Sequence, residues 1–141
     1  MNKFKKITFI LNLKGKVRRK CVTEYSNSDK IKIKNNIEPS EGELARIDIK
    51  IDNDKTILSE LFVPEEYRRK GYASKIRSKA IKYLLKKGIT EIETLCCPFE
   101  ENISLSELSK FYKKNFLDNG AYEVKLNLGN EINHIQAYFY K

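Results

Sequence analysis

The chain has little of the chemistry that would place it outside the cell or at a metal. It contains no tryptophan, one histidine and three cysteines in 141 residues. Cys21, Cys96 and Cys97 are an odd number with two adjacent members, which is not the pattern of a disulfide framework. The adjacent pair has no further ligands at a metal-binding spacing. We therefore expect no disulfides, no metal site and a reducing, cytoplasmic location.

Long hydrophobic runs are also missing. No apolar run approaches the ~18 residues that a transmembrane helix needs. Residues 1–13 alternate in polarity and no small-residue cleavage site follows, so we predict neither a signal peptide nor a membrane partner. No internal repeat or long linker divides the chain, and 40% of its residues are hydrophobic. Residues 1–141 are therefore predicted to form a single domain.

What the chain has in excess is positive charge. Lys and Arg number 28 against 19 Asp and Glu, which gives a net charge of +9. This balance favours anionic partners such as nucleic acid or a CoA-like cofactor. The lysines are spread along the chain instead of forming one tail, so a lysine-rich host composition explains the charge as well.

Alternating polar and apolar residues predict that much of the chain forms strands. Turn residues at Lys14-Gly15 and at 52–54 predict that neighbouring strands form hairpins. The predicted strands cover residues 5–13, 17–25, a short stretch at Ile31 and Ile33, 44–51, 56–63, 89–96, 122–128 and 135–140.

Two segments have helical periodicity instead. Apolar residues recur at three- and four-residue steps over 72–86, and Gly88 ends this predicted helix. The opposite, polar side of the helix is predicted to carry Lys75, Arg77, Lys79, Lys82 and Lys86. Ser104 and Glu107 form a capping box that opens a second helix, which ends at 118–120. This order of elements predicts a mixed α/β sheet with two helices in crossover or packing roles.

The junction between the 56–63 strand and the first helix carries the clearest functional signal. The basic segment Arg68-Arg69-Lys70-Gly71-Tyr72-Ala73 lies there. A helix start offers unpaired N–H groups and a positive dipole end, and glycine lets the backbone approach a ligand closely. The combination indicates a site for a phosphate-bearing ligand such as a nucleotide cofactor. An ordinary solvated basic helix start is the alternative.

From Val63 to Ala73, this segment resembles the acyl-CoA-binding motif of the GNAT N-acetyltransferase superfamily. The family motif is Gln/Arg-x-x-Gly-x-Gly/Ala after the fourth core strand, and Arg68, Gly71 and Ala73 match it. The resemblance covers roughly residues 44–128 in the order of its elements. It implies a GNAT-like α/β fold with a mixed, mostly antiparallel central sheet and a few packing helices.

The resemblance also implies how acetyl-CoA would bind as a co-substrate. In the family, backbone N–H groups of the loop hold the CoA pyrophosphate, and the preceding strand pairs with the pantetheine arm. The matching loop residues are Arg68, Arg69, Lys70, Gly71, Tyr72, Ala73 and Ser74, of which the first three add positive charge. The matching strand residues are Leu61, Phe62 and Val63. These three also fit an ordinary central core strand.

Tyr112 matches the tyrosine that protonates the departing CoA thiolate in this family. It follows Phe111 on a predicted helix and precedes Gly120 and a strand, which is similar to the family's second motif. A phenol, whose unperturbed pKa is about 10, can donate a proton to a leaving thiolate. The alternative is that Tyr112 only packs on the apolar face of its helix.

The amine nucleophile must lose a proton, and Glu60 is the best candidate for the general base. Its side chain is expected to face opposite to those of Leu61 and Val63 along the strand. Glu60 could equally form an ion pair with one of the many lysines. The weaker candidates are Glu100, Glu101 and His134. A covalent acyl-enzyme on the adjacent cysteines lacks an activating histidine at a recognisable spacing.

The N-terminal region departs most from the family. The family usually places two helices between its first and second strands, whereas residues 14–43 show strand-like alternation and loop signals. We expect the N-terminal helices to be reduced or absent, with the acceptor side open or completed by a partner chain, as in a homodimer. Leu105 stands where the family commonly has an asparagine, and the spacing from Tyr112 to Gly120 is longer than usual.

Together these features predict an N-acetyltransferase that transfers an acetyl group from acetyl-CoA to a primary amine. The acceptor would be a small molecule, a peptide or a protein, and the amine would attack directly in a ternary complex. One alternative is a GNAT-like module that binds CoA or a partner without turnover. Another is a basic protein that contacts nucleic acid, although no aromatic stacking motif of the RNA-binding type is present.

Overall fold

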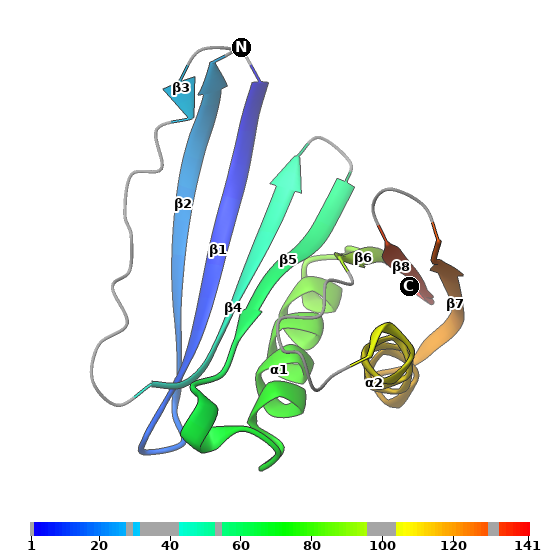
Figure 1. Cartoon of the computed structure of the whole chain (residues 1–141). Helices are drawn as coiled ribbons and strands as arrows, with labels where there is room; N and C mark the ends of the chain where they lie inside the picture. The colour runs from blue at the N-terminus through cyan, green and yellow to red at the C-terminus, as the bar shows by residue number, and fades with distance from the viewer. Residues whose placement is uncertain (1, 28–29, 32–42, 53–54, 96–103, 130–132) are drawn as a thin grey trace.

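A computed structural model describes residues 2–27, 30–31, 43–52, 55–95, 104–129 and 133–141. Strands and helices follow one another along these residues as Figure 1 shows. In chain order they are β1 (Asn2–Asn12), β2 (Val17–Asn27), β3 (Lys30–Ile31), β4 (Glu43–Asp52), β5 (Lys55–Phe62), the 3₁₀ helix η1 (Glu65–Tyr67), α1 (Tyr72–Lys86), β6 (Glu91–Leu95), α2 (Leu105–Asp118), β7 (Ala121–Asn127) and β8 (His134–Phe139). In this part of the chain no helix is both long and apolar enough to cross a membrane.

The strands form one mixed sheet in the order β3-β2-β1-β4-β5-β6-β8-β7. Every neighbouring pair is antiparallel except β5 and β6, which run parallel. The chain joins these two strands through α1, because parallel neighbours need a crossover connection. The predicted mixed, mostly antiparallel sheet is therefore confirmed.

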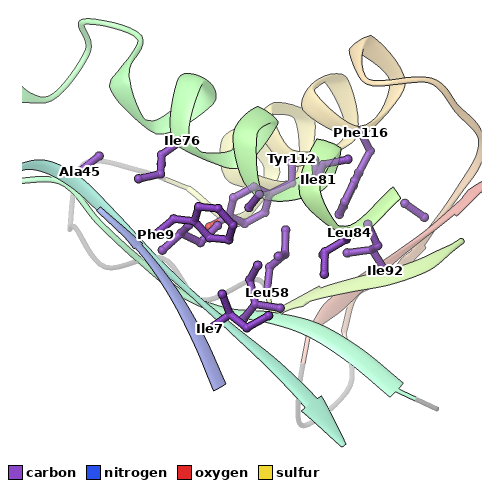
Figure 2. Packing of buried hydrophobic residues seen from close by; sticks show 14 of the residues in the cluster. Ile7, Phe9, Ala45, Leu58, Ile76, Ile81, Leu84, Ile92, Tyr112 and Phe116 are labelled. Carbon is purple, nitrogen blue, oxygen red and sulfur yellow. The ribbon is translucent and has the colours of Figure 1, made fainter. Parts of the chain in front are cut away.

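Both helices pack on one face of the sheet and share a single hydrophobic core with it (Figure 2). Alternate residues of the strands and every third or fourth residue of the helices point into this core. Its most deeply buried members include Ile7, Ile47, Ile92, Leu84 and Phe116. Helix α1 packs against β4 and β1, and its first turn lines the same cavity as the end of β5.

The N-terminal region forms a long hairpin. β1 and β2 pair antiparallel from Asn2 and Ser26 to Leu11 and Val17. In the region 14–43, the residues that the structure describes are strand, turn or coil and none is helical, which agrees with the expected reduction of the N-terminal helices. Ile33, which the pattern places in a short strand, lies outside the described residues.

One residue of the predicted polar side of α1 lies inside the protein. Arg77 is only 1% exposed, whereas the four lysines predicted on that side are exposed. The prediction for Arg77 was therefore wrong. Position 77 is four residues after Ala73 and four before Ile81, so it belongs to the inward-facing stripe by spacing. Its charge, not its position, made it look like a surface residue.

Candidate functional site

The parallel strands β5 and β6 separate before β5 ends. Pairing between them is limited to residues 57–58 of β5 and 93–94 of β6. A β-bulge at Ser59, where the register between β4 and β5 shifts, lies at the point of separation. β5 then continues to Phe62, and within the described residues β4 is its only strand partner there. The free edge of these last residues presents backbone N–H and C=O groups.

The loop after β5 has a backbone suited to an anion. Arg69 and Gly71 adopt left-handed φ angles of 64° and 86°. Left-handed residues in such a loop turn successive N–H groups toward one concave side. Gly71 is the N-cap of α1 and supplies no side-chain cap, so the N–H groups of the first turn stay available. A Cβ at Gly71 would meet nothing within 4 Å, so the φ angle alone requires glycine here.

Side chains hold this loop against the end of β5. The Nε atom of Arg68 donates a hydrogen bond to the carbonyl oxygen of Val63 at 2.8 Å. The rings of Tyr67 and Tyr72 pack edge to face with centroids 6.4 Å apart. The side chain of Arg68 therefore helps to stabilise the loop, whereas that of its neighbour Arg69 is exposed to solvent.

A cavity of about 970 Å³ opens between the end of β5, the loop and α2. Its lining residues are Glu60, Leu61, Phe62, Val63, Tyr67, Arg68, Arg69, Gly71, Tyr72, Ala73, Ser74, Glu107, Leu108, Phe111 and Tyr112. This set contains every predicted cofactor-binding residue except Lys70, together with both predicted catalytic residues. Four lining residues were not predicted as site residues: Tyr67, Glu107, Leu108 and Phe111. The last three lie on α2, whose approach to β5 depends on how the helices pack. The volume suits a cofactor-sized ligand.

Tyr112 and Glu60 line this cavity in different environments. Tyr112 is 2% exposed and packs in the hydrophobic core, as the alternative interpretation expected (Figure 2). It also lines the cavity, and its role as a proton donor stays a prediction. Glu60 is exposed, while Leu61 is half-buried and Val63 is buried. The predicted opposition of Glu60 to its two neighbours is thus confirmed. A phenol within the wall and a carboxylate at the solvent side suit a proton donor and a proton acceptor.

A buried polar network lies behind Tyr112. The Cζ atom of Arg77 is 4.3 Å from the centre of the Tyr112 ring. Its Nε donates to Oδ1 of Asn115 at 3.0 Å, and its Nη1 donates to Oγ1 of Thr94 at 3.1 Å. Asn115 and Thr94 are 3% and 1% exposed. This network was not predicted from the sequence, although the spacing of Arg77 on α1 is a usable signal.

The weaker base candidates lie elsewhere or are not described. His134 lies outside the cavity, where its Nε2 is 3.4 Å from Oε1 of Glu93. Two of these base candidates, Glu100 and Glu101, lie outside the described residues. So do Cys96 and Cys97, which were considered for a covalent acyl-enzyme. Within the described ranges, no group of three His, Cys, Asp or Glu side chains could hold a metal ion.

Comparison with known sequences defines the class of protein. The model of the acetyltransferase (GNAT) family matches residues 38–116, which is more than half of the chain, so the chain belongs to this family. The matched segment includes the end of β5, the loop, α1 and Tyr112. No curated protein matches the sequence.

Solved structures share the fold. PaiA N-acetyltransferase from Thermoplasma acidophilum, in complex with coenzyme A, is 25% identical with a TM-score of 0.50. That match covers 70% of this chain and 55% of PaiA, so the chain spans just over half of the relative's length. The anti-CRISPR protein AcrVA5 matches at 18% identity and a TM-score of 0.50, over 65% of this chain and 87% of its own. This second likeness concerns the fold alone. The GNAT-like fold implied by the motifs is confirmed.

Proposed function

We propose that this protein is an acetyl-CoA-dependent N-acetyltransferase that acts as a single cytoplasmic domain. One observation carries the proposal: the free edge of β5 and the uncapped start of α1 open onto the same cavity of about 970 Å³. CoA suits this combination, because its pyrophosphate needs N–H donors and its extended pantetheine arm can pair with a strand edge. Family membership and the CoA-bound PaiA structure support this ligand.

The donor would bind along β5 and across the loop. N–H groups of residues 69–74 hold the pyrophosphate, and the exposed side chains of Arg69 and Lys70 add positive charge. Backbone groups of residues 61–63 pair with the pantetheine arm as an added strand does. The acetyl thioester then lies in the opening between β5 and β6, beside Tyr112.

The reaction is a direct attack in a ternary complex. The amine nitrogen attacks the acetyl carbonyl carbon, a C–N bond forms, and the C–S bond breaks with its electron pair leaving on sulfur. Tyr112 donates its proton to this thiolate, and Glu60 accepts the proton of the amine directly or through water. Backbone N–H groups of β5 polarise the thioester carbonyl. Holding both substrates in one cleft supplies much of the rate.

The acceptor is a primary amine on a small molecule, a peptide or a protein. The described part of the N-terminal region forms a hairpin instead of the helices that usually shape the acceptor pocket in this family. This arrangement supports an open acceptor side, or one that a second copy of the chain completes.

Two measurements test the proposal. Acetyl-CoA at about 100 times its Kd should stabilise the protein by roughly 2.7 kcal/mol, which thermal unfolding detects. Thiol release from acetyl-CoA in the presence of spermidine or a lysine-containing peptide then separates an enzyme from a binding module. No thermal shift at high ligand and no CoA in soaked crystals would contradict the proposal. A salt-dependent shift with tRNA in place of acetyl-CoA would support the nucleic-acid alternative.

A further inference from the structure

We propose that Arg77 is a positioning residue, which orients Tyr112 and stabilises the negative charge that forms on it during turnover. The inference rests on the proposed function, because it concerns the proton that Tyr112 gives to the CoA thiolate. Arg77 is the largest of the fully buried side chains in the described residues and is 1% exposed. Such a side chain is unusual in a core, so its contacts call for a physical explanation.

The contacts of Arg77 join its own helix α1 to α2 and β6. On α2, its Cζ is 4.3 Å from the Tyr112 ring centre and 4.9 Å from that of Phe116, and its Nε bonds to Asn115 at 3.0 Å. On β6, its Nη1 bonds to Thr94 at 3.1 Å. Thr94 belongs to the last residue pair between β5 and β6 before these strands separate. Arg77, itself on α1, therefore meets both α2 and β6 where the opening begins.

Asn115 extends this network to the loop that would hold the cofactor. Its Nδ2 lies 3.4 Å from Oγ of Ser74 and 3.3 Å from Oγ of Ser78. Ser74 lies in the first turn of α1 and lines the cavity. The same buried side chains thus contact the expected pyrophosphate site and the helix that carries Tyr112.

Packing alone does not explain a guanidinium at this position. Burying a charge is energetically costly, and a hydrophobic side chain of similar volume often gives an equally stable core. A planar guanidinium does offer fixed hydrogen-bond directions, so its bonds to Asn115 and Thr94 set its plane against the Tyr112 ring. When Tyr112 donates its proton, the resulting phenolate lies beside a fixed positive charge that water does not screen.

A double-mutant cycle tests this role. We would measure thiol release from acetyl-CoA, with spermidine and a lysine-containing peptide as amine probes, for Arg77→Met, Tyr112→Phe and the double variant. Arg77→Met should lower kcat about thirtyfold with the KM for acetyl-CoA changed less than about threefold. In the Tyr112→Phe background the same change should cost less than about threefold. Lys79→Met is the matched control, because Lys79 is an exposed cation on the same helix.

The outcomes separate this inference from the proposed function. An equal loss in both backgrounds would mean that Arg77 only supports the fold, and no loss on Arg77→Met would also overturn the inference. Unchanged turnover in Tyr112→Phe would instead overturn the catalytic use of Tyr112. No thiol release by the wild-type protein with either probe would count against both proposals.

A measurement independent of the acceptor covers the case in which Arg77→Met does not fold. Arg77→Lys keeps the charge and loses the planar fork. The ¹³Cζ signal of Tyr112, assigned by its loss in Tyr112→Phe, should move in Arg77→Lys and stay in place in Lys79→Met. An unmoved signal in Arg77→Lys would overturn the proposal whatever the turnover.

Discussion

The two ends of the β5–β6 pair carry cavities of opposite character. At the end where β5 begins, a cavity of about 470 Å³ is lined by acidic side chains that include Asp52, Glu91 and Glu93. At the end where the strands separate, the cavity of about 970 Å³ is lined by the loop, the start of α1 and several aromatic rings. Strand β5 therefore borders both an acidic site and a site suited to an anion, whereas β6 lines only the acidic one.

The difference shows that local donors, not net charge, distinguish the anion site. At the acidic end, the carboxylate of Glu93 lies 3.4 Å from Nζ of Lys55 and 3.4 Å from Nε2 of His134, so side chains of the protein itself already face it. At the other end, the N-cap residue Gly71 supplies no side-chain cap, so the first N–H groups of α1 stay available. The net charge of +9 is spread over the whole chain, so it does not indicate the character of either cavity.

The largest expected effect is a loss of kcat on substitution of Tyr112, at the end of the pair where β5 and β6 separate. Tyr112→Phe should lower kcat about 100-fold and change the Kd for acetyl-CoA less than twofold, because only the proton donor is lost. Thiol-release kinetics and calorimetric titration measure the two quantities. Tyr122→Phe is the control, since Tyr122 is 51% exposed on β7. Equal turnover in Tyr112→Phe and wild type would remove Tyr112 from the mechanism.

A second prediction compares two glycines at the two ends of α1. Gly71 and Gly88 have φ angles of 86° and 83°, and an added Cβ at either would meet nothing within 4 Å. Alanine at either position should cost roughly 1 kcal/mol of backbone strain. Only Gly71→Ala should weaken acetyl-CoA binding, by about tenfold. The strain at position 71 shifts the N–H groups of the loop that lines the cavity, whereas Gly88 lies at the far end of α1. Equal affinities of the two variants for acetyl-CoA would contradict the proposed binding loop.

A smaller loss of kcat is expected on substitution of Glu60, at the solvent side of the cavity. Glu60→Gln should lower kcat about fivefold, since water can still carry away part of the amine proton. Glu66→Gln, an exposed change in η1, should leave kcat unaltered. If both variants turn over like the wild type, Glu60 is not the base.

The smallest effect on activity is expected from the acidic end. Glu93→Gln removes the carboxylate that faces Lys55 and His134, so it should lower the free energy of unfolding by about 1 kcal/mol. Its kcat and acetyl-CoA affinity should stay within about twofold of wild type. A strong loss of acetyl-CoA binding would show that the two ends of the β5–β6 pair are not independent.

The sequence predicted most of the elements because their signals are local. Helix α1 runs from Tyr72 to Lys86 as its periodicity indicated, with Gly71 and Gly88 at its ends. The capping box also placed α2 correctly, since Ser104 Oγ accepts a hydrogen bond from the N–H of Glu107 at 3.1 Å. The strands begin and end within three residues of their predicted limits where the structure describes them.

The parts that the sequence did not predict depend on tertiary contacts. The bulge at Ser59 is a matter of register between β4 and β5, which no local pattern reveals. Arg77 was assigned to the polar side from its charge, although packing of α1 against α2 and β6 buries it. The loop motif did predict the cavity residues between Arg68 and Ser74, apart from Lys70, because the turn chemistry at Gly71 is local.

A crystal structure of the protein with CoA is the sharpest test of the proposed donor site. We expect pyrophosphate oxygens within hydrogen-bond distance of the backbone nitrogens of residues 69–74, and the pantetheine arm paired along residues 61–63. CoA bound at the acidic end of the β5–β6 pair, or no CoA bound at a saturating concentration, would contradict it.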